Sequence, residues 1–249
     1  MTLQGTNTYL LGTGRRRILI DTGQGLPAWT TRLRRTLQQE GATVEIALIS
    51  HWHPDHIGGV EELLAVAPDA IVYKHDPWPG QRPILDGQQF TTQGATLTAA
   101  HTPGHTQDHM VFILKDENAM FTADNLLGHG TAIFDDLSLY MASLAKMCTL
   151  FSGRAYPGHG AVIESGSARI VEYIAHRRHR EEQMLQTMRG DANRVWRAMD
   201  VVRIVYHDVP QELHAAACGG VLQVLGKLQG EGRVKGDGDG GWRLTPSGT

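Results

Sequence analysis

Three histidines and one aspartate lie within six consecutive residues, in the segment His51-Trp52-His53-Pro54-Asp55-His56. The apolar run 46–49 comes directly before this segment and is typical of a buried strand. Imidazole and carboxylate groups are the ligands that zinc and similar divalent ions prefer. A strand that ends in such a loop therefore places four potential metal ligands at one edge of a sheet.

Four further motifs also follow predicted strands. They are Ile20-Asp21-Thr22-Gly23, His101-Thr102-Pro103-Gly104-His105-Thr106, Phe121-Thr122-Ala123-Asp124-Asn125 and Tyr156-Pro157-Gly158-His159-Gly160. Loops at one edge of a pair of packed sheets can converge, and glycines let the backbone turn tightly there. Three neutral imidazoles leave an open position on a catalytic zinc ion. The two oxygens of the Asp124 carboxylate can link two cations.

Strand hairpins alternate with single helices along the first 190 residues. The sequence predicts strands over 6–11, 17–20, 44–50, 70–73, 95–100, 110–114, 119–122 and 154–156, and helices over 29–39, 58–67, 137–151 and 167–188. This order favours an α/β fold in which helices cover two packed sheets from outside. Because residues 2–5 already read as part of a strand, we also expect that a further strand has been lost upstream.

The residues after about 190 follow a different pattern. Helices are predicted over 194–206 and 213–229, and a small hairpin over 232–235 and 242–244. Two helices and a hairpin are typical of a winged-helix-like module. We therefore predict a catalytic domain over 1–190 and a winged-helix-like appendage over 191–249.

Composition excludes several classes of protein. The net charge of −3 and the pI near 6.5 give no electrostatic footprint for nucleic acid. The two cysteines, Cys148 and Cys218, lie far apart and indicate no disulfide framework. No apolar run is long enough to span a membrane, and no signal peptide is visible. We therefore expect a cytoplasmic protein with neither a membrane nor a nucleic acid as its partner.

The series of motifs resembles the metallo-β-lactamase superfamily over at least residues 6–165. The resemblance implies a four-layer αββα sandwich with a site for two divalent ions, zinc by default, although manganese or iron also fits these ligands. By motif, the ligands of one ion would be His51, His53 and His105. The ligands of the second ion would be Asp55, His56 and His159, and Asp124 would bridge the two ions. Asp55 can also orient the attacking water as a catalytic residue.

Other residues near these motifs have lesser expected roles. Asp21 is expected to hydrogen-bond a ligand histidine, because such partners orient metal ligands. His101 is expected to support the loop that carries His105. His109 and His129 lie next to the site, and for each of them contact with the substrate or with a ligand is as plausible as no role.

Two metal ions favour hydrolysis, because they lower the pKa of bound water to roughly 7. Finer motifs, including residues 3–10, 105–110, 121–137 and 173–181, resemble the lactamase-β-2-like branch and fungal lactamase-type thioesterases that act with polyketide synthases. The resemblance implies a metal-dependent thioester hydrolase of secondary metabolism. It would release an aromatic polyketide from the acyl carrier protein domain of a non-reducing synthase as a carboxylic acid, as in atrochrysone carboxylic acid release. Trp52, Trp78 and Phe134 could contact the acyl group, with core packing as the alternative. A departure from many relatives is Ala123, where they carry glycine.

Two alternatives stay open. The same branch contains an endoribonuclease that cleaves single-stranded RNA, and two metals suit phosphodiester hydrolysis equally well. Alternatively, the chain serves as a docking module through its C-terminal segment and its basic runs, which would suit an acidic carrier protein. These basic runs are 15–17, 32–35 and 177–178.

Overall fold

The structure is a computed structural model that describes residues 5–246. Residues 1–4, on which the expected strand-like start of the chain partly falls, lie outside the described residues. The chain forms two compact units, one up to Val171 and the other from Glu172 on. The division lies inside helix α5 (Gly166–Arg189), so the domain boundary after residue 190 stays a prediction.

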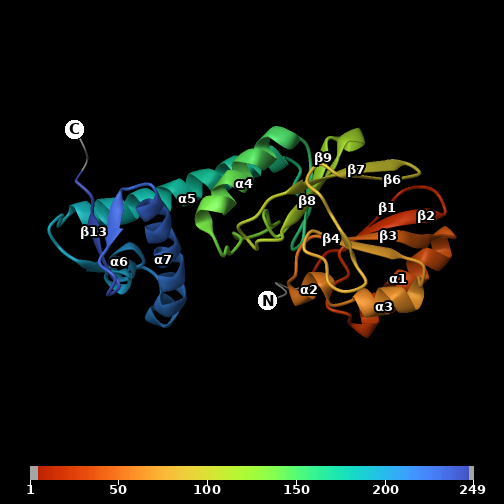
Figure 1. Cartoon of the computed structure of the whole chain (residues 1–249), viewed down its shortest axis with the longest axis horizontal. Helices are drawn as coiled ribbons and strands as arrows, with labels where there is room; N and C mark the ends of the chain where they lie inside the picture. Colours follow the sequence, from red (N-terminus) through yellow and green to blue (C-terminus); the bar gives the residue numbers. More distant parts are fainter. Residues whose placement is uncertain (1–4, 247–249) are drawn as a thin grey trace. The chain divides into compact units, whose positions relative to one another are not determined.

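The first sheet of the first unit contains the metal-ligand motif after its central strand. Its strands, in spatial order, are β1 (Tyr9–Leu11), β2 (Arg16–Ile20), β3 (Thr43–Ile49), β4 (Ile71–Lys74) and β5 (Arg82–Pro83). β1 and β2 form the predicted antiparallel hairpin, and β2 to β5 run parallel. Helices α1 (Pro27–Glu40) and α3 (Val60–Val66) lie on one side of this sheet, whereas the short α2 (Pro54–Ile57) belongs to the motif itself (Figure 1).

The second sheet contributes the remaining motifs. Its strands, in spatial order, are β10 (Ala155–Pro157), β9 (Ala119–Ala123), β8 (Met110–Leu114), β7 (Ala95–His101) and β6 (Gln89–Thr92). Only the pair β10 and β9 is parallel within this sheet. A 3-10 turn, η1 (Lys115–Glu117), joins β8 to β9, and α4 (Leu137–Leu150) follows the loop after β9.

Two hydrophobic cores hold these layers together. Between the sheets, Ile20 and Leu48 of the first sheet pack with Phe112 and Phe121 of the second. On the other side of the first sheet, side chains of its strands pack against α1 and α3. β8 and β9 are buried along their whole length, as expected for strands that are covered on both faces. The fold is therefore the expected αββα sandwich.

The five motifs meet at one edge of this sandwich because of strand direction. β2 and β3 are parallel, so Asp21 and His51 emerge from the same ends of neighbouring strands. The Met110 amide at the start of β8 donates to the Ser50 carbonyl at a distance of 2.8 Å and joins the two sheets at this edge.

The second unit contains the predicted helices and hairpin. Its elements after α5 are β11 (Trp196–Arg197), α6 (Ala198–Val205), the 3-10 turn η2 (Gln211–Leu213), α7 (His214–Gly230), β12 (Val234–Gly236) and β13 (Gly241–Leu244). The three strands form a sheet in the order β11-β13-β12. The helix predicted from residue 194 begins only at Ala198, because Trp196 is buried and pairs with Trp242 in the sheet. No helix among the described residues is both long and apolar enough to cross a membrane.

Candidate metal centre

All seven predicted ligands lie together at the motif edge, in two adjoining groups. Within each group, the possible ligand atoms lie within 4.8 Å of one another. The first group is His51, His53, His105 and Asp124, and the second is Asp55, His56 and His159. Only His53 is more than slightly accessible to solvent.

Three nitrogens of the first group face one another. His51 Nε2 lies 3.0 Å from His53 Nδ1, which lies 3.1 Å from His105 Nε2. Ligand nitrogens about 2.0–2.1 Å from a tetrahedral zinc ion are separated by about 3.3 Å, so the observed spacing is close to that of a metal site.

Hydrogen bonds on the far side of two rings leave these nitrogens without protons. The Ser50 hydroxyl donates to Asp21 Oδ2 (2.8 Å) and can therefore accept from His51 Nδ1 (2.9 Å). His105 Nδ1 donates to the Ile133 carbonyl at 2.8 Å. Both Nε2 atoms then carry lone pairs that point toward His53 Nδ1, and a proton on that atom could satisfy only one of them. A cation at this position would satisfy all three nitrogens.

Hydrogen bonds also hold the side chains of the second group. His56 Nδ1 donates to Asp21 Oδ2 at 2.7 Å, which confirms the expected contact between Asp21 and a ligand histidine. His159 Nδ1 donates to the Gly5 carbonyl at 3.0 Å, and the Thr6 hydroxyl donates to Asp55 Oδ2 at 2.9 Å. Each of these contacts fixes the orientation of a side chain that could bind a metal ion.

Asp124 connects the two groups. Its Oδ1 lies 3.3 Å from His56 Nε2, while its Oδ2 lies 3.3 Å from His159 Nε2 and 3.6 Å from His105 Nε2. Despite this proximity, Asp124 Oδ1 and both the His56 and His159 Nε2 atoms are buried with no hydrogen bond of acceptable geometry. Buried polar atoms without partners are costly. The donor set and these unpartnered atoms fit a pair of divalent cations.

Burial and neighbouring charges have different net effects on the pKa values of the histidines in the two groups. Burial lowers the pKa of His51, His53 and His105 below its ordinary value, which favours neutral imidazoles. Burial also opposes protonation of His56 and His159. There, however, the neighbouring carboxylates are stronger and raise the pKa of each ring to about 10. Protons and divalent cations would therefore compete for the Nε2 atoms of these two rings.

The backbone is strained at two positions of the site. Asp21 and Ala123 adopt left-handed conformations with φ of 57° and 41°, and this region disfavours residues other than glycine. The left-handed φ explains why glycine suits the position before Asp124, where the methyl group of Ala123 is the departure noted from the sequence. Gly158 is required for a different reason, because a Cβ there would collide with the Asp124 carboxylate.

The other histidines near the site do not join either ligand group. His101 Nε2 donates to the Gln107 carbonyl at 2.8 Å, as expected for a residue that supports the His105 loop. His109 is fully buried behind the site, and its Nε2 accepts from the Asp124 amide at 3.3 Å. His129 is exposed.

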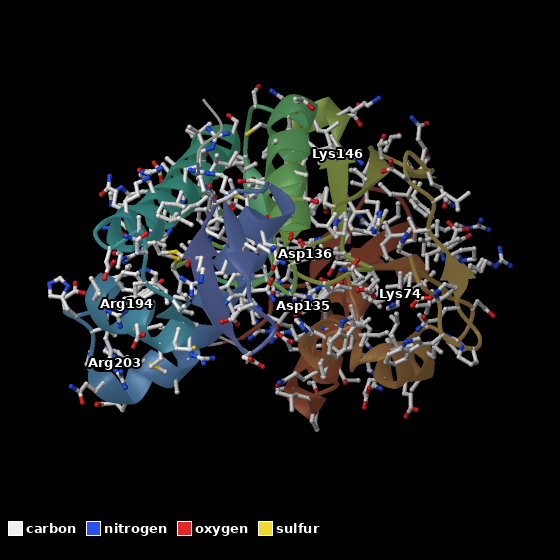
Figure 2. All side chains as sticks on the ribbon, turned by 60° about the vertical axis from the view of Figure 1, so that its left-hand side comes forward. Lys74, Asp135, Asp136, Lys146, Arg194 and Arg203 are labelled. Atoms are coloured by element: carbon white, nitrogen blue, oxygen red, sulfur yellow. The ribbon has the colours of Figure 1, made fainter. Side chains whose placement is uncertain are left out.

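Sequence reasoning missed a buried ion pair beside the site. Lys74 Nζ, at the end of β4, lies 2.5 Å from Asp108 Oδ2 in the loop between β7 and β8. The Thr106 hydroxyl donates to Asp108 Oδ1 at 2.7 Å, so the pair holds the loop that carries His105. Figure 2 shows Lys74 on the first sheet and Lys146 on the separate helix α4, with Asp136 directly before the start of that helix. An isolated lysine at the end of an apolar strand was the only sequence signal for this pair.

Comparison with known proteins agrees with the motifs. A sequence profile described as the metallo-beta-lactamase superfamily matches residues 1–172, and one described as the beta-lactamase associated winged helix domain matches residues 198–242. The chain is 46% identical over 248 residues to lactamase-like protein nscB of Arthroderma gypseum, with 94% of this chain and 79% of the relative covered. It is 47% identical over 242 residues to lactamase-like protein vrtG of Penicillium aethiopicum, with the same coverage of both chains.

Two crystal structures share the fold at low sequence identity. A metallo-beta-lactamase family protein from Thermus thermophilus has a TM-score of 0.76 and 22% identity, over 96% of this chain and 94% of that chain. A beta-lactamase domain protein from Burkholderia ambifaria has a TM-score of 0.82 and 19% identity, over 98% and 88% of the two chains. The fold, the profile match and the relatives agree: this chain belongs to the metallo-β-lactamase superfamily.

Proposed function

We propose that this chain is a metal-dependent hydrolase that cleaves the thioester of an aromatic polyketide bound to an acyl carrier protein. The observation that carries the proposal is the pair of ligand groups that meet at Asp124, in a chain 46–47% identical to two fungal lactamase-like proteins. Such a site suits hydrolysis in general. The choice of a thioester, and of secondary metabolism, follows from the finer motif resemblance, and the product would be the free carboxylic acid.

The parts of the site would have different roles in such a reaction. Two divalent ions, when bound, would supply a hydroxide nucleophile at neutral pH and stabilise negative charge on the carbonyl oxygen. Asp55 is positioned to orient the attacking water: burial opposes its ionisation, but His159, His56 and Thr6 lower its pKa to about 2. The leaving group is a thiolate, which needs no strong acid to assist it because thiols ionise near pH 8.5.

Exposed aromatic side chains support an aromatic acyl group. Trp52 is 46% exposed, and its ring centroid lies 4.6 Å from that of His53. Trp78 is 50% exposed, whereas Phe134 is half-buried and stacks on Tyr140 with centroids 5.5 Å apart. A large apolar ring left open to solvent beside a ligand histidine suits contact with a planar substrate. Trp52 is therefore the best placed of the three predicted contacts.

An acidic carrier protein is the proposed partner, and we propose that it docks on the second of the basic runs. Arg16 and Arg17 are already paired with Glu45 at 2.8 Å and Glu40 at 3.2 Å, so they offer little free positive charge. The second basic run, over 32–35, lies on α1. Reversing the charges at positions 34 and 35 should slow turnover of carrier-bound thioesters and spare small ones. Equal rates on both would remove this docking surface.

The decisive experiment compares two substrates under two metal conditions. Metal-loaded and metal-stripped protein is incubated with a carrier-bound aromatic polyketide thioester and, separately, with single-stranded RNA. We expect metal-dependent release of the carrier thiol, its abolition in Asp124→Ala, and full activity in the control Asp116→Asn, since Asp116 is exposed in η1. RNA cleavage without thiol release would contradict the proposal and favour the endoribonuclease alternative.

A further inference from the structure

A cavity of about 560 Å³ adjoins the second ligand group. Its walls come from three segments: the residues before β1, the loop after β2, and the first turns of α1. Two of its lining residues also touch the ligand group. Thr6 donates to Asp55, and the Gly5 carbonyl accepts from His159. Two residues that line the cavity therefore hold side chains of the second ligand group in place, so the cavity lies next to that group.

The walls of the cavity combine apolar side chains with one positively charged side chain. Leu26 is 56% exposed, and the Trp29 ring is held in place by its Nε1, which donates to the Thr8 hydroxyl at 3.0 Å. Arg32 supplies the positive charge, and no acidic residue lines the cavity within the described part of the chain. Arg32 is exposed and has no ion-pair partner among residues 5–246.

Arg15, Arg34 and Arg35 of the basic runs in this unit also have no ion-pair partner among residues 5–246, so Arg32 is distinguished by the cavity that it lines. Arg16 and Arg17 are paired, as described above. Arg34, also on α1, lines a separate cavity with Gly41 and Thr43. These residues lie next to the start of β3, and the metal ligands follow the end of that strand. Arg32 and Arg34 therefore line different cavities, although they are only two positions apart in the sequence.

We propose that this cavity binds the phosphopantetheine arm of a thioester substrate, with Arg32 contacting the phosphate. The direction assigned to the arm rests on the proposed thioesterase function. The sulfur would lie at the second ligand group, the apolar part of the arm along Leu26 and Trp29, and the anion at Arg32. A guanidinium group binds phosphate through paired hydrogen bonds, and Arg32 is the cationic residue that lines this cavity.

Binding and turnover test the inference separately. Binding of phosphopantetheine and of pantetheine, which differ only in the phosphate, is measured by calorimetry on metal-loaded protein. Wild type should bind phosphopantetheine at least about tenfold more tightly, the effect of about one charge-assisted hydrogen bond. Arg32→Ala should lose this preference and Arg32→Lys should keep part of it, whereas the control Lys115→Ala, at an exposed residue of η1 that does not line this cavity, should retain it in full.

The outcomes distinguish this inference from the proposed function. Equal binding of the two compounds by wild type, or an unchanged preference in Arg32→Ala, overturns the role of Arg32. A preference that depends on Arg32, in a protein that cleaves no acyl-phosphopantetheine, supports the cavity and refutes the thioesterase. Arg32→Ala should raise the KM for acyl-carrier-bound and acyl-coenzyme A substrates and leave that for acyl-pantetheine unchanged. The natural source of the arm is then the substrate that wild type turns over with the higher kcat/KM.

Discussion

Replacement of Lys74 by methionine should destabilise the first unit more than any comparable change at the surface. The Lys74 side chain is 1% exposed and that of Asp108 is 7% exposed, and their charged atoms lie 2.5 Å apart. Methionine keeps most of the length and the apolar bulk of lysine, so the substitution removes mainly the ammonium group. The Asp108 carboxylate would then stay buried without its counterion.

The expected cost can be worked from the remaining contacts. Removal of one partner of a buried ion pair costs about 3–5 kcal/mol. The Thr106 hydroxyl still donates to Asp108, so we expect a value near the lower end, about 3 kcal/mol. Since 1 kcal/mol shifts the Tm of a domain of this size by about 2–4 °C, the Tm should fall by about 6–12 °C.

The same substitution at Lys146 provides a matched control. Lys146 Nζ pairs with Asp86 at 3.0 Å, but the two side chains are 38% and 57% exposed. Exposed pairs contribute at most about 1 kcal/mol, so Lys146→Met should lower the Tm by no more than about 4 °C.

Thermal unfolding followed by circular dichroism, on metal-stripped protein, compares the two variants directly. The double variant Lys74→Met/Asp108→Asn removes both charges and should lose less stability than the sum of the two single variants. Equal Tm shifts for Lys74→Met and Lys146→Met, or simple additivity in the double variant, would refute the reasoning.

Three further predictions concern the metal edge. Asp21→Asn cannot accept all the hydrogen bonds that Asp21 accepts, so metal affinity measured by chelator competition should fall about 10- to 100-fold; unchanged affinity would contradict this. His56 and His159 have pKa values raised to about 10 and are protonated at neutral pH until a cation displaces the protons, so affinity should rise from pH 6 to 8; a flat profile would contradict this. Gly104→Ala should unfold at lower temperature, because φ is 128° and a Cβ would collide with the Tyr140 backbone.

Sequence patterns predicted the elements that are apolar or sharply ended. The helix over 29–39 is found as α1, which ends at Gly41 with φ of 58°. β5 and β6 were missed, because Arg82 and Pro83 are exposed and β6 has a single fully buried residue, Phe90. Such edge strands form through pairing with a neighbour, and a short polar segment carries no periodic signal of that pairing.

The residues of the two groups were predictable from sequence, whereas the groups that orient their side chains were not. Histidine and aspartate at strand ends have a recognisable spacing, and all seven predicted residues lie in the two groups. The Gly5 carbonyl, the Thr6 hydroxyl and the Ile133 carbonyl orient three of these side chains. A backbone carbonyl or a single hydroxyl has no pattern that indicates which distant side chain it will contact, so only the fold reveals it.

Each ligand group draws its members from both halves of the sandwich. In the second group, for example, His56 follows β3 of the first sheet, whereas His159 follows β10 of the second. A bound ion would therefore act as a cross-link between the sheets, and at a free concentration a thousand times its Kd it would add about 4 kcal/mol to stability. The supply of metal would then govern the lifetime of the folded protein as well as its rate of catalysis.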